Sequence, residues 1–218
     1  MIKEFVRNPF VILCIGFAIL LLFPLFFTPK GDIFLWINAR HELALDFFFR
    51  YWTHMGNGVW LALLLVFFLF YKYYFVVVTA LSIVFQSILV SVFKRWLFAG
   101  LPRPKAFFGD EINLNLVEGV DVHVVNTFPS GHTATAFALF ALLVLAFAIR
   151  KTWLSILFFI MAVLVGISRV YLVQHFFIDV YAGACIGLIS VIGGIAATQL
   201  WFLKNYPERL QGSLLRRG

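Results

Sequence analysis

The sequence predicts an all-α, polytopic membrane protein with six transmembrane helices, one interfacial helix and a long polar loop outside the cytoplasm. Hydrophobic residues make up 63% of the 218 positions, whereas soluble domains contain about 45–50% apolar residues. Charged residues make up only 12%, and the mean hydropathy is +0.99. Because so few polar residues cannot cover the apolar ones in water, we expect a lipid bilayer as the solvent.

Six segments approach the length of about 20 apolar residues that a helix needs to cross the hydrocarbon core. They are residues 9–28, 57–71, 73–93, 131–149, 152–168 and 179–203. The first segment follows Lys3 and Arg7, which also suits a signal peptide, but it is long for one and no A-x-A-like site follows it. We therefore expect a retained helix in a single domain of residues 1–218, with a core of about 57–203.

Two longer connections join these segments. Residues 31–54 mix Trp and Phe with charged side chains, which is typical of a helix lying in the membrane interface. We expect His41 and His54 in this segment to be interfacial or structural. Residues 94–130 carry most of the remaining polar side chains.

The distribution of basic residues predicts the orientation. With six helices, both termini lie on one side, which carries nine basic residues against the acidic Glu4 and Glu208. The other side carries eight basic and eight acidic residues. Because cytoplasmic loops are enriched in Lys and Arg, we expect cytoplasmic termini and outward-facing long loops. This topology also explains the net charge of +7 without nucleic-acid binding.

The two cysteines, Cys14 and Cys185, both lie within apolar runs. We interpret them as small buried hydrophobic residues and not as a disulfide or a metal-binding pair. No C-x-x-C or H-E-x-x-H pattern occurs, so nothing in the sequence predicts a zinc site.

Three polar stretches interrupt the apolar sequence, and the six-helix topology puts all three on the same side of the membrane. They are KRWLFAGLPRP at 94–104, FPSGH at 128–132 and SRVYLVQHFFID at 168–179. Each alone has a simple structural explanation: basic anchors at a helix end, a serine N-cap, or a hydrogen bond on a helix surface. Because all three stretches are expected on the same side of the membrane, we expect them to form one site.

The residue types in these stretches suit phosphate chemistry. Ser130 and Gly131 open a helix, whose N-terminus offers free N–H groups and a positive dipole end to an anion. His175 and Asp179 are four residues apart, which on a helix puts both on one face, so that the carboxylate fixes the tautomer of a nucleophilic or basic imidazole. Lys and Arg nearby can stabilise the equatorial oxygens of a transferring phosphoryl group. Since no carboxylate cluster is available for Mg²⁺, we expect a metal-free reaction through a covalent histidine.

At these residues the sequence resembles the type 2 phosphatidic acid phosphatase (PAP2) family, whose pattern is K-x6-RP, PSGH and SR-x5-H-x3-D. PSGH is complete at 129–132, and the third motif is complete from Ser168 to Asp179. The positions of the motifs relative to the predicted helices extend the resemblance over nearly the whole chain.

The first motif departs from the family pattern. Eight residues separate Lys94 from Arg103, and seven separate Arg95 from Arg103, where the family has six. We expect an insertion near Ala99–Gly100 that keeps Lys94 in the site, with Arg95 as the alternative.

The resemblance implies a role for each motif residue. His175 attacks phosphorus and forms a phosphohistidine, Asp179 orients it, and His132 protonates the leaving oxygen and then activates water. The resemblance also implies a set of residues that hold the phosphate oxygens: Lys94, Arg103, Ser130, Gly131 and Arg169. It implies no metal and no other cofactor.

The resemblance further implies an integral lipid phosphatase of the bacterial inner (plasma) membrane, reached laterally by lipid head groups. The family's bacterial substrates include phosphatidylglycerophosphate, undecaprenyl diphosphate, phosphatidic acid and lipid A phosphates, and all four stay alternatives. We expect residues 30–55 and 105–127 to shape the choice. Five titratable residues of the second segment have no assigned role: Asp110, Glu111, Glu118, Asp121 and His123.

Two other functions fit part of the pattern. A non-catalytic lipid-phosphate binding or transport protein would use the same anion site. However, no charged residue interrupts the apolar interior of a predicted helix, and a nucleophile with an orienting carboxylate has no purpose in mere binding. A haloperoxidase would need bound vanadate, and the family's peroxidases are soluble. The expected partners are therefore a lipid phosphate and the bilayer, without nucleic acid.

Overall fold

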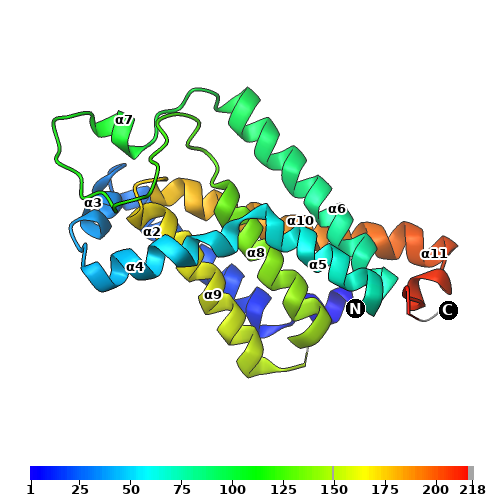
Figure 1. Ribbon diagram of the computed structural model, residues 1–218. Coiled ribbons are helices and arrows are strands. Elements are labelled where there is room, and N and C mark those ends of the chain that lie inside the picture. The colour runs from blue at the N-terminus through cyan, green and yellow to red at the C-terminus, as the bar shows by residue number, and fades with distance from the viewer. Residues whose placement is uncertain (149, 216–218) are drawn as a thin grey trace.

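The computed structural model describes residues 1–148 and 150–215, and within these ranges it contains helices and no β-strand (Figure 1). The longer helices are α2 (Pro9–Phe27), α4 (Leu43–Trp52), α5 (Gly58–Tyr71), α6 (Tyr73–Val92), α8 (Gly131–Leu143), α9 (Thr152–Tyr171) and α10 (Phe177–Ala197). The shorter ones are α1 (Ile2–Val6), α3 (Asp32–Asn38), α7 (Pro104–Phe108) and α11 (Leu203–Asn205). The predicted all-α class is confirmed.

Five helical segments are long and apolar enough to cross a membrane. They are Pro9–Phe27, Tyr73–Leu97, Gly131–Ala148, Thr152–Tyr171 and Phe177–Asn205. The predicted second span, α5, has 14 residues and reaches only about 21 Å at 1.5 Å per residue. It qualifies only together with α4, to which it is joined at a bend of 49°. The described residues therefore contain five spans, or six if the bent pair of α4 and α5 counts as one.

The segment between the first two spans forms two helices where the sequence suggested one interfacial helix. The second of them, α4, leads through the turn η1 (Thr53–Gly56) into α5. Packing and polar contacts to α9 hold α4 in place: the Phe49 ring lies 4.8 Å from the Tyr171 ring, and the Tyr171 hydroxyl donates to Asp46 at 2.5 Å. His41, 3.0 Å from Asp46, completes this contact and is structural, as expected.

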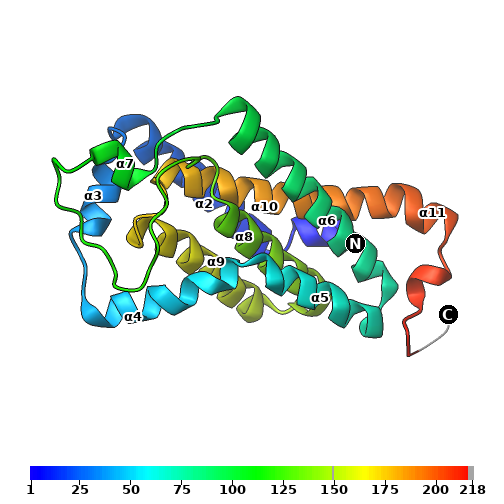
Figure 2. The same ribbon diagram turned by 45° about the horizontal axis from the view of Figure 1, so that its top comes forward.

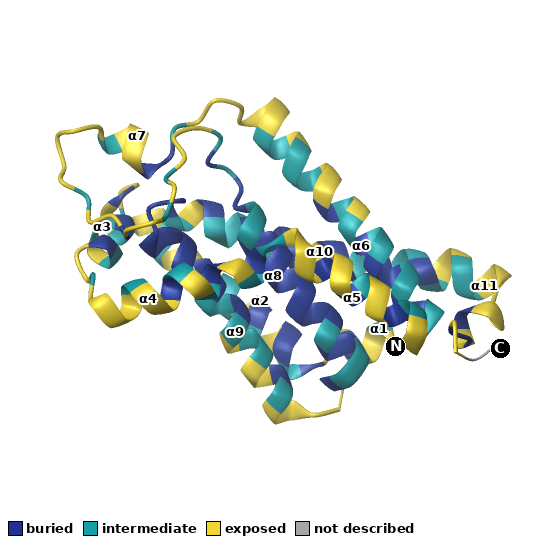
Figure 3. Cartoon of the chain, in the orientation of Figure 1, coloured by how far each residue is buried: buried dark blue, intermediate teal, exposed yellow. Residues whose placement is uncertain are grey.

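Helix α8 occupies the centre of the bundle (Figure 3). In the span that contains α8, 72% of the residues are buried inside the protein. In the span of α2 only 17% are buried, so α2 lies at the periphery of the bundle. The buried face of α8 includes the small residues Ala134, Ala138 and Ala141. Small side chains allow the neighbouring helices α9 and α10 to come close.

Two glycines of α10 make its closest contact with α8. A Cβ added at Gly183 would lie 2.5 Å from the carbonyl oxygen of Ser130, and one added at Gly187 would overlap the carbonyl oxygen of Ala134. Glycines four residues apart are a common device for bringing membrane helices together. Here they fix the first turn of α8 beside the first turns of α10.

The polar stretches gather at one end of the bundle, which we call the site end. There α9 ends, α8 and α10 begin, and the loop between α6 and α8 crosses over them (Figure 2). The N-terminus and the described C-terminal segment lie toward the other end (Figure 1). Of the basic tail residues used for the orientation, Arg216 and Arg217 lie outside the described residues. The orientation itself stays a prediction.

Gly187→Ala should destabilise the protein, because the added methyl group meets the α8 backbone. Overpacking of this kind typically costs about 1–3 kcal/mol, which should lower the midpoint of thermal unfolding in detergent. Gly16→Ala on α2 is the matched control, since its Cβ meets nothing within 4 Å and alanine favours a helix over glycine by about 1 kcal/mol. Equal unfolding midpoints for the two variants would contradict this packing.

Candidate active site

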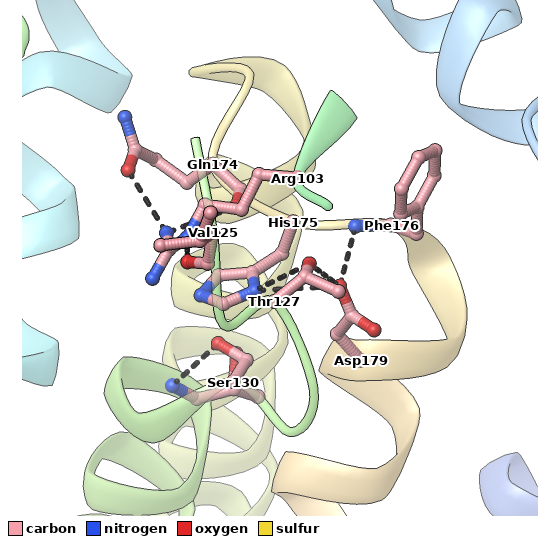
Figure 4. A network of polar contacts seen from close by, with 9 residues as sticks. Arg103, Val125, Thr127, Ser130, Gln174, His175, Phe176 and Asp179 are labelled. Carbon is pink, nitrogen blue, oxygen red and sulfur yellow. Dashed lines mark hydrogen bonds and ion pairs between the residues drawn. The ribbon is translucent and has the colours of Figure 1, made fainter. Parts of the chain in front are cut away.

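His175 and Asp179 lie close together at the connection between α9 and α10. The chain turns after Tyr171, and α10 starts at Phe177, so His175 lies before the helix and not on one helical face with Asp179, as the spacing suggested. The His175 N–H donates to the carbonyl of Arg169 at 3.1 Å. The Asp179 carboxylate, in the first turn of α10, accepts from the N–H of Phe176 at 2.9 Å. The imidazole Nδ1 and the carboxylate Oδ2 end up 3.4 Å apart (Figure 4).

Thr127 joins this pair and was not identified from the sequence. Its hydroxyl donates to Asp179 Oδ2 and lies 3.5 Å from His175 Nδ1 (Figure 4). All three side chains are buried, with exposures of 2% or less. A carboxylate beside Nδ1 favours the tautomer with the proton on Nδ1, which leaves the Nε2 lone pair free for chemistry. The only sequence signal for Thr127 was its place just before the PSGH motif.

The surroundings keep His175 neutral. Burial lowers the pKa of its imidazole well below the ordinary value of 6.5, and the positive charges of Arg103, Arg169 and Lys94 lower the pKa further. A neutral imidazole at pH 7 is the nucleophilic form.

Arg103 is fixed by backbone carbonyls and by a residue that the sequence did not single out, Gln174. The guanidinium Nε donates to the carbonyl of Val125 at 2.9 Å, and Nη1 donates to the carbonyl of Gln174 at 3.0 Å (Figure 4). The Gln174 side chain in turn donates to the carbonyl of Asp121 at 2.9 Å. The carbonyls of Asp121 and Val125 thus support Gln174 and Arg103, whereas the five unassigned titratable side chains of the loop are exposed.

Arg169 is held from the bend between α4 and α5. Its Nη1 donates to the Thr53 hydroxyl at 2.7 Å, across 116 positions of sequence. Its Nε is buried and has no hydrogen-bond partner among the described residues. A buried, unpaired N–H of a charged group is costly and is typical of a site whose ligand would supply the acceptor. No local sequence signal pointed to Thr53.

Two local irregularities lie within the longer first motif. Lys94 lies in a π-helical turn, η2 (Phe93–Leu97), which holds more residues per turn than an α-helix. Gly100 then turns the chain with φ +77°, and its N–H donates to the Asn126 side chain at 3.0 Å. Lys94 is half-buried, with its charge acting on His175, whereas Arg95 is exposed. The geometry favours Lys94 over Arg95 as the site cation.

The start of α8 contacts the first turn of α10 on one side and the turn η1 on the other. The Ser130 hydroxyl accepts from the N–H of Thr133 at 3.4 Å, and the Ser130 N–H donates to the carbonyl of Asp179 at 2.9 Å. Ser130 therefore caps the helix, and Gly131 takes its first position. The half-buried His132 packs against Gly56, where an added Cβ would lie 2.7 Å from the carbonyl oxygen of His132.

The donor set of the site suits a phosphate anion and not a bound cation. The charges of three cationic side chains act on His175, and the N-terminus of α8 begins nearby, where the Ser130 N–H donates to the carbonyl of Asp179. Across the described ranges, no group of three or more His, Cys, Asp and Glu side chains is placed to hold a metal ion.

Comparisons with known proteins agree with this geometry. The sequence profile of the PAP2 superfamily matches residues 74–203. The lipid A 4'-phosphatase of Bacteroides thetaiotaomicron is 30% identical over 196 residues, 83% of this chain and 79% of that protein. The lipid A 1-phosphatase of Porphyromonas gingivalis is 41% identical over 69 residues, 32% of this chain but only 16% of that protein.

A solved structure also shares the fold. The crystal structure of Aquifex aeolicus LpxE superposes with a TM-score of 0.66 and 30% identity, covering 77% of this chain and 94% of that chain. Profile, relatives and fold agree with the motifs at the site end. The chain therefore belongs to the PAP2 superfamily, the type 2 phosphatidic acid phosphatases that its motifs indicate.

Proposed function

We propose that this membrane lipid phosphatase hydrolyses a lipid phosphate through a phosphohistidine on His175. The observation that carries this proposal is the buried His175–Asp179 pair, with Nδ1 and Oδ2 3.4 Å apart, where three cationic side chains are close enough for their charges to act on His175. A pure binding site needs the cations but not a neutral imidazole whose proton is held at Nδ1. That difference favours catalysis over lipid-phosphate binding or transport.

The proposed reaction has two steps. In the first, the Nε2 lone pair of His175 attacks phosphorus, the bond from phosphorus to the lipid oxygen breaks, and His132 donates a proton to that oxygen. In the second, His132 takes a proton from water, the water oxygen attacks phosphorus, and the phosphorus–nitrogen bond breaks to release phosphate. Asp179 holds the imidazole and stabilises its positive charge in both steps.

The cations would hold the three equatorial oxygens of the phosphoryl group. Lys94, Arg103 and Arg169 are the proposed ligands, and the orphaned Nε of Arg169 supports this most directly. The backbone N–H of Gly131, at the α8 N-terminus, would add a further donor. Ser130 contributes to the phosphate site through the helix start that it caps.

Lipid A phosphate is the substrate that the comparisons support best. Two relatives are named as lipid A phosphatases, one of them aligned over most of both chains. Phosphatidylglycerophosphate, undecaprenyl diphosphate and phosphatidic acid are the alternatives. We further propose that the protein spans the bacterial inner membrane with cytoplasmic termini, so that the site end faces outward.

Phosphate release from a lipid panel tests this function. The purified protein should release phosphate from lipid A in excess EDTA, and vanadate should inhibit, because it mimics pentacoordinate phosphorus. His175→Ala should lower the rate at least about a thousandfold, since it removes the nucleophile. His123→Ala, at an exposed loop histidine, is the matched control.

Two results would argue against this mechanism. Loss of activity in EDTA with recovery in Mg²⁺ would exclude the metal-free histidine route. Lipid A binding without hydrolysis of any panel lipid would favour the binding protein instead, and preference for another panel lipid would correct the substrate alone.

Thr53→Val should weaken phosphate binding through Arg169, because it removes the acceptor of a charged hydrogen bond and leaves the guanidinium free to move. Hydrogen bonds to charged groups contribute about 1.5–3 kcal/mol, so kcat/KM should fall by roughly 10- to 100-fold, mainly through a higher KM. Thr53→Ser keeps the hydroxyl and should restore most of the activity. A purely structural role would instead show as equal losses in both variants, tracking their thermal unfolding.

A further inference from the structure

An apolar cavity of about 500 Å³ lies between α2, α9 and α10, apart from the phosphate site. Its walls include Ala18 of α2, Val163 of α9 and Ala184 of α10, and Trp36 of α3 also lines it. We propose that this cavity holds one acyl chain of a resident anionic phospholipid, a bilayer lipid distinct from the substrate, whose head group lies beside Lys30.

The cavity and the phosphate site use different faces of α10. Gly183 and Gly187 face α8 and the site, whereas Val180 and Ala184 line the cavity. The ring of Phe176, next to His175, borders a smaller hollow that opens beside the cavity. The acyl chain would therefore lie on the face of α10 that turns away from α8, while Lys30 at the mouth lies close enough for its charge to act on Asp179.

The depth of the cavity matches one leaflet of a bilayer. Along α10 its lining extends from Phe177 to Ile189, which is about 18 Å at 1.5 Å per residue. Half of a hydrocarbon core is about 15 Å. Because Phe177 is at the site end, the leaflet is the one on the side of the phosphate site. The residues that line the cavity are almost all apolar, so within a bilayer hydrocarbon is its natural content.

The outer mouth of the cavity carries a positive charge. A hollow of about 250 Å³ adjoins the cavity, with Ile33 and Phe177 in the linings of both, and its lining includes Lys30. The Lys30 Nζ lies 4.6 Å from the ring centroid of Phe176 and 4.9 Å from that of Phe107. These rings hold the exposed ammonium group over the hollow, where a head-group phosphate would meet it. Charge at the mouth and hydrocarbon within match an anionic phospholipid.

Lipid titration monitored by native mass spectrometry tests this site on the detergent-purified protein. The probes are phosphatidylglycerol and phosphatidylcholine with identical acyl chains. One phosphatidylglycerol should bind per chain. It should bind about fivefold more tightly than phosphatidylcholine, because one lysine near an anionic head group contributes about 1 kcal/mol. Lys30→Gln should abolish that preference. Lys151→Gln, an exposed lysine at the opposite end of the bundle, makes the same charge change and should preserve it.

Two cavity-filling variants test the acyl-chain pocket. Ala18→Trp and Ala184→Trp fill it from opposite walls and should weaken the binding of both lipids at least about tenfold. Ala62→Trp, on the exposed face of α5, is the matched control and should bind both lipids like the unaltered protein.

Three outcomes would overturn the proposal. They are unchanged lipid binding in both cavity-filling variants, equal affinity of the unaltered protein for the two lipids, and a dimer that Ala18→Trp dissociates, which would make a second copy the occupant. Since the readout is binding and not hydrolysis, none of these results depends on the proposed reaction.

Discussion

The close contact between α8 and α10 is the constraint on which the site depends. Gly183 and Gly187 let the two helices approach until their backbones touch, a distance that any side chain would increase. At that distance the Ser130 N–H reaches the carbonyl of Asp179, at 2.9 Å. One hydrogen bond thus joins the PSGH motif to the motif that carries the nucleophile. The anion-binding start of α8 and the carboxylate of α10 are positioned by the same packing.

Around this contact, burial and charge act together on His175. The imidazole is almost completely enclosed, and three cations stand close by, so the neutral form is strongly favoured. Asp179 and Thr127 lie beside Nδ1 of His175, where the carboxylate favours a proton on Nδ1. A phosphate dianion entering the site would neutralise the cations and pair with the orphaned Nε of Arg169. A bound phosphate would supply the hydrogen-bond acceptor that this N–H lacks.

The sequence predicted the long helices well, and its motifs pointed to residues that the fold brings together, because both are local signals. Apolar length identified α2, α6, α8, α9 and α10, and the three motifs identified the His175–Asp179 pair and its cations. The break between α4 and α5 was missed, since residues 53–56 form a short turn inside a mixed segment. Thr53, Thr127 and Gln174 were also missed, because each acts on a partner far away in sequence: Arg169, Asp179 and Arg103 respectively. Such residues are chosen by tertiary packing and carry no pattern of their own.

Trapping the covalent intermediate is the most direct test of the central claim. The purified protein would be mixed with ³²P-labelled lipid A, quenched within one turnover in alkaline denaturant, and digested for peptide analysis. A phosphohistidine reaction predicts an alkali-stable, acid-labile label on the peptide that contains His175, and no label in His175→Ala. Hydrolysis that proceeds without any labelled protein, or a label on another residue, would contradict it.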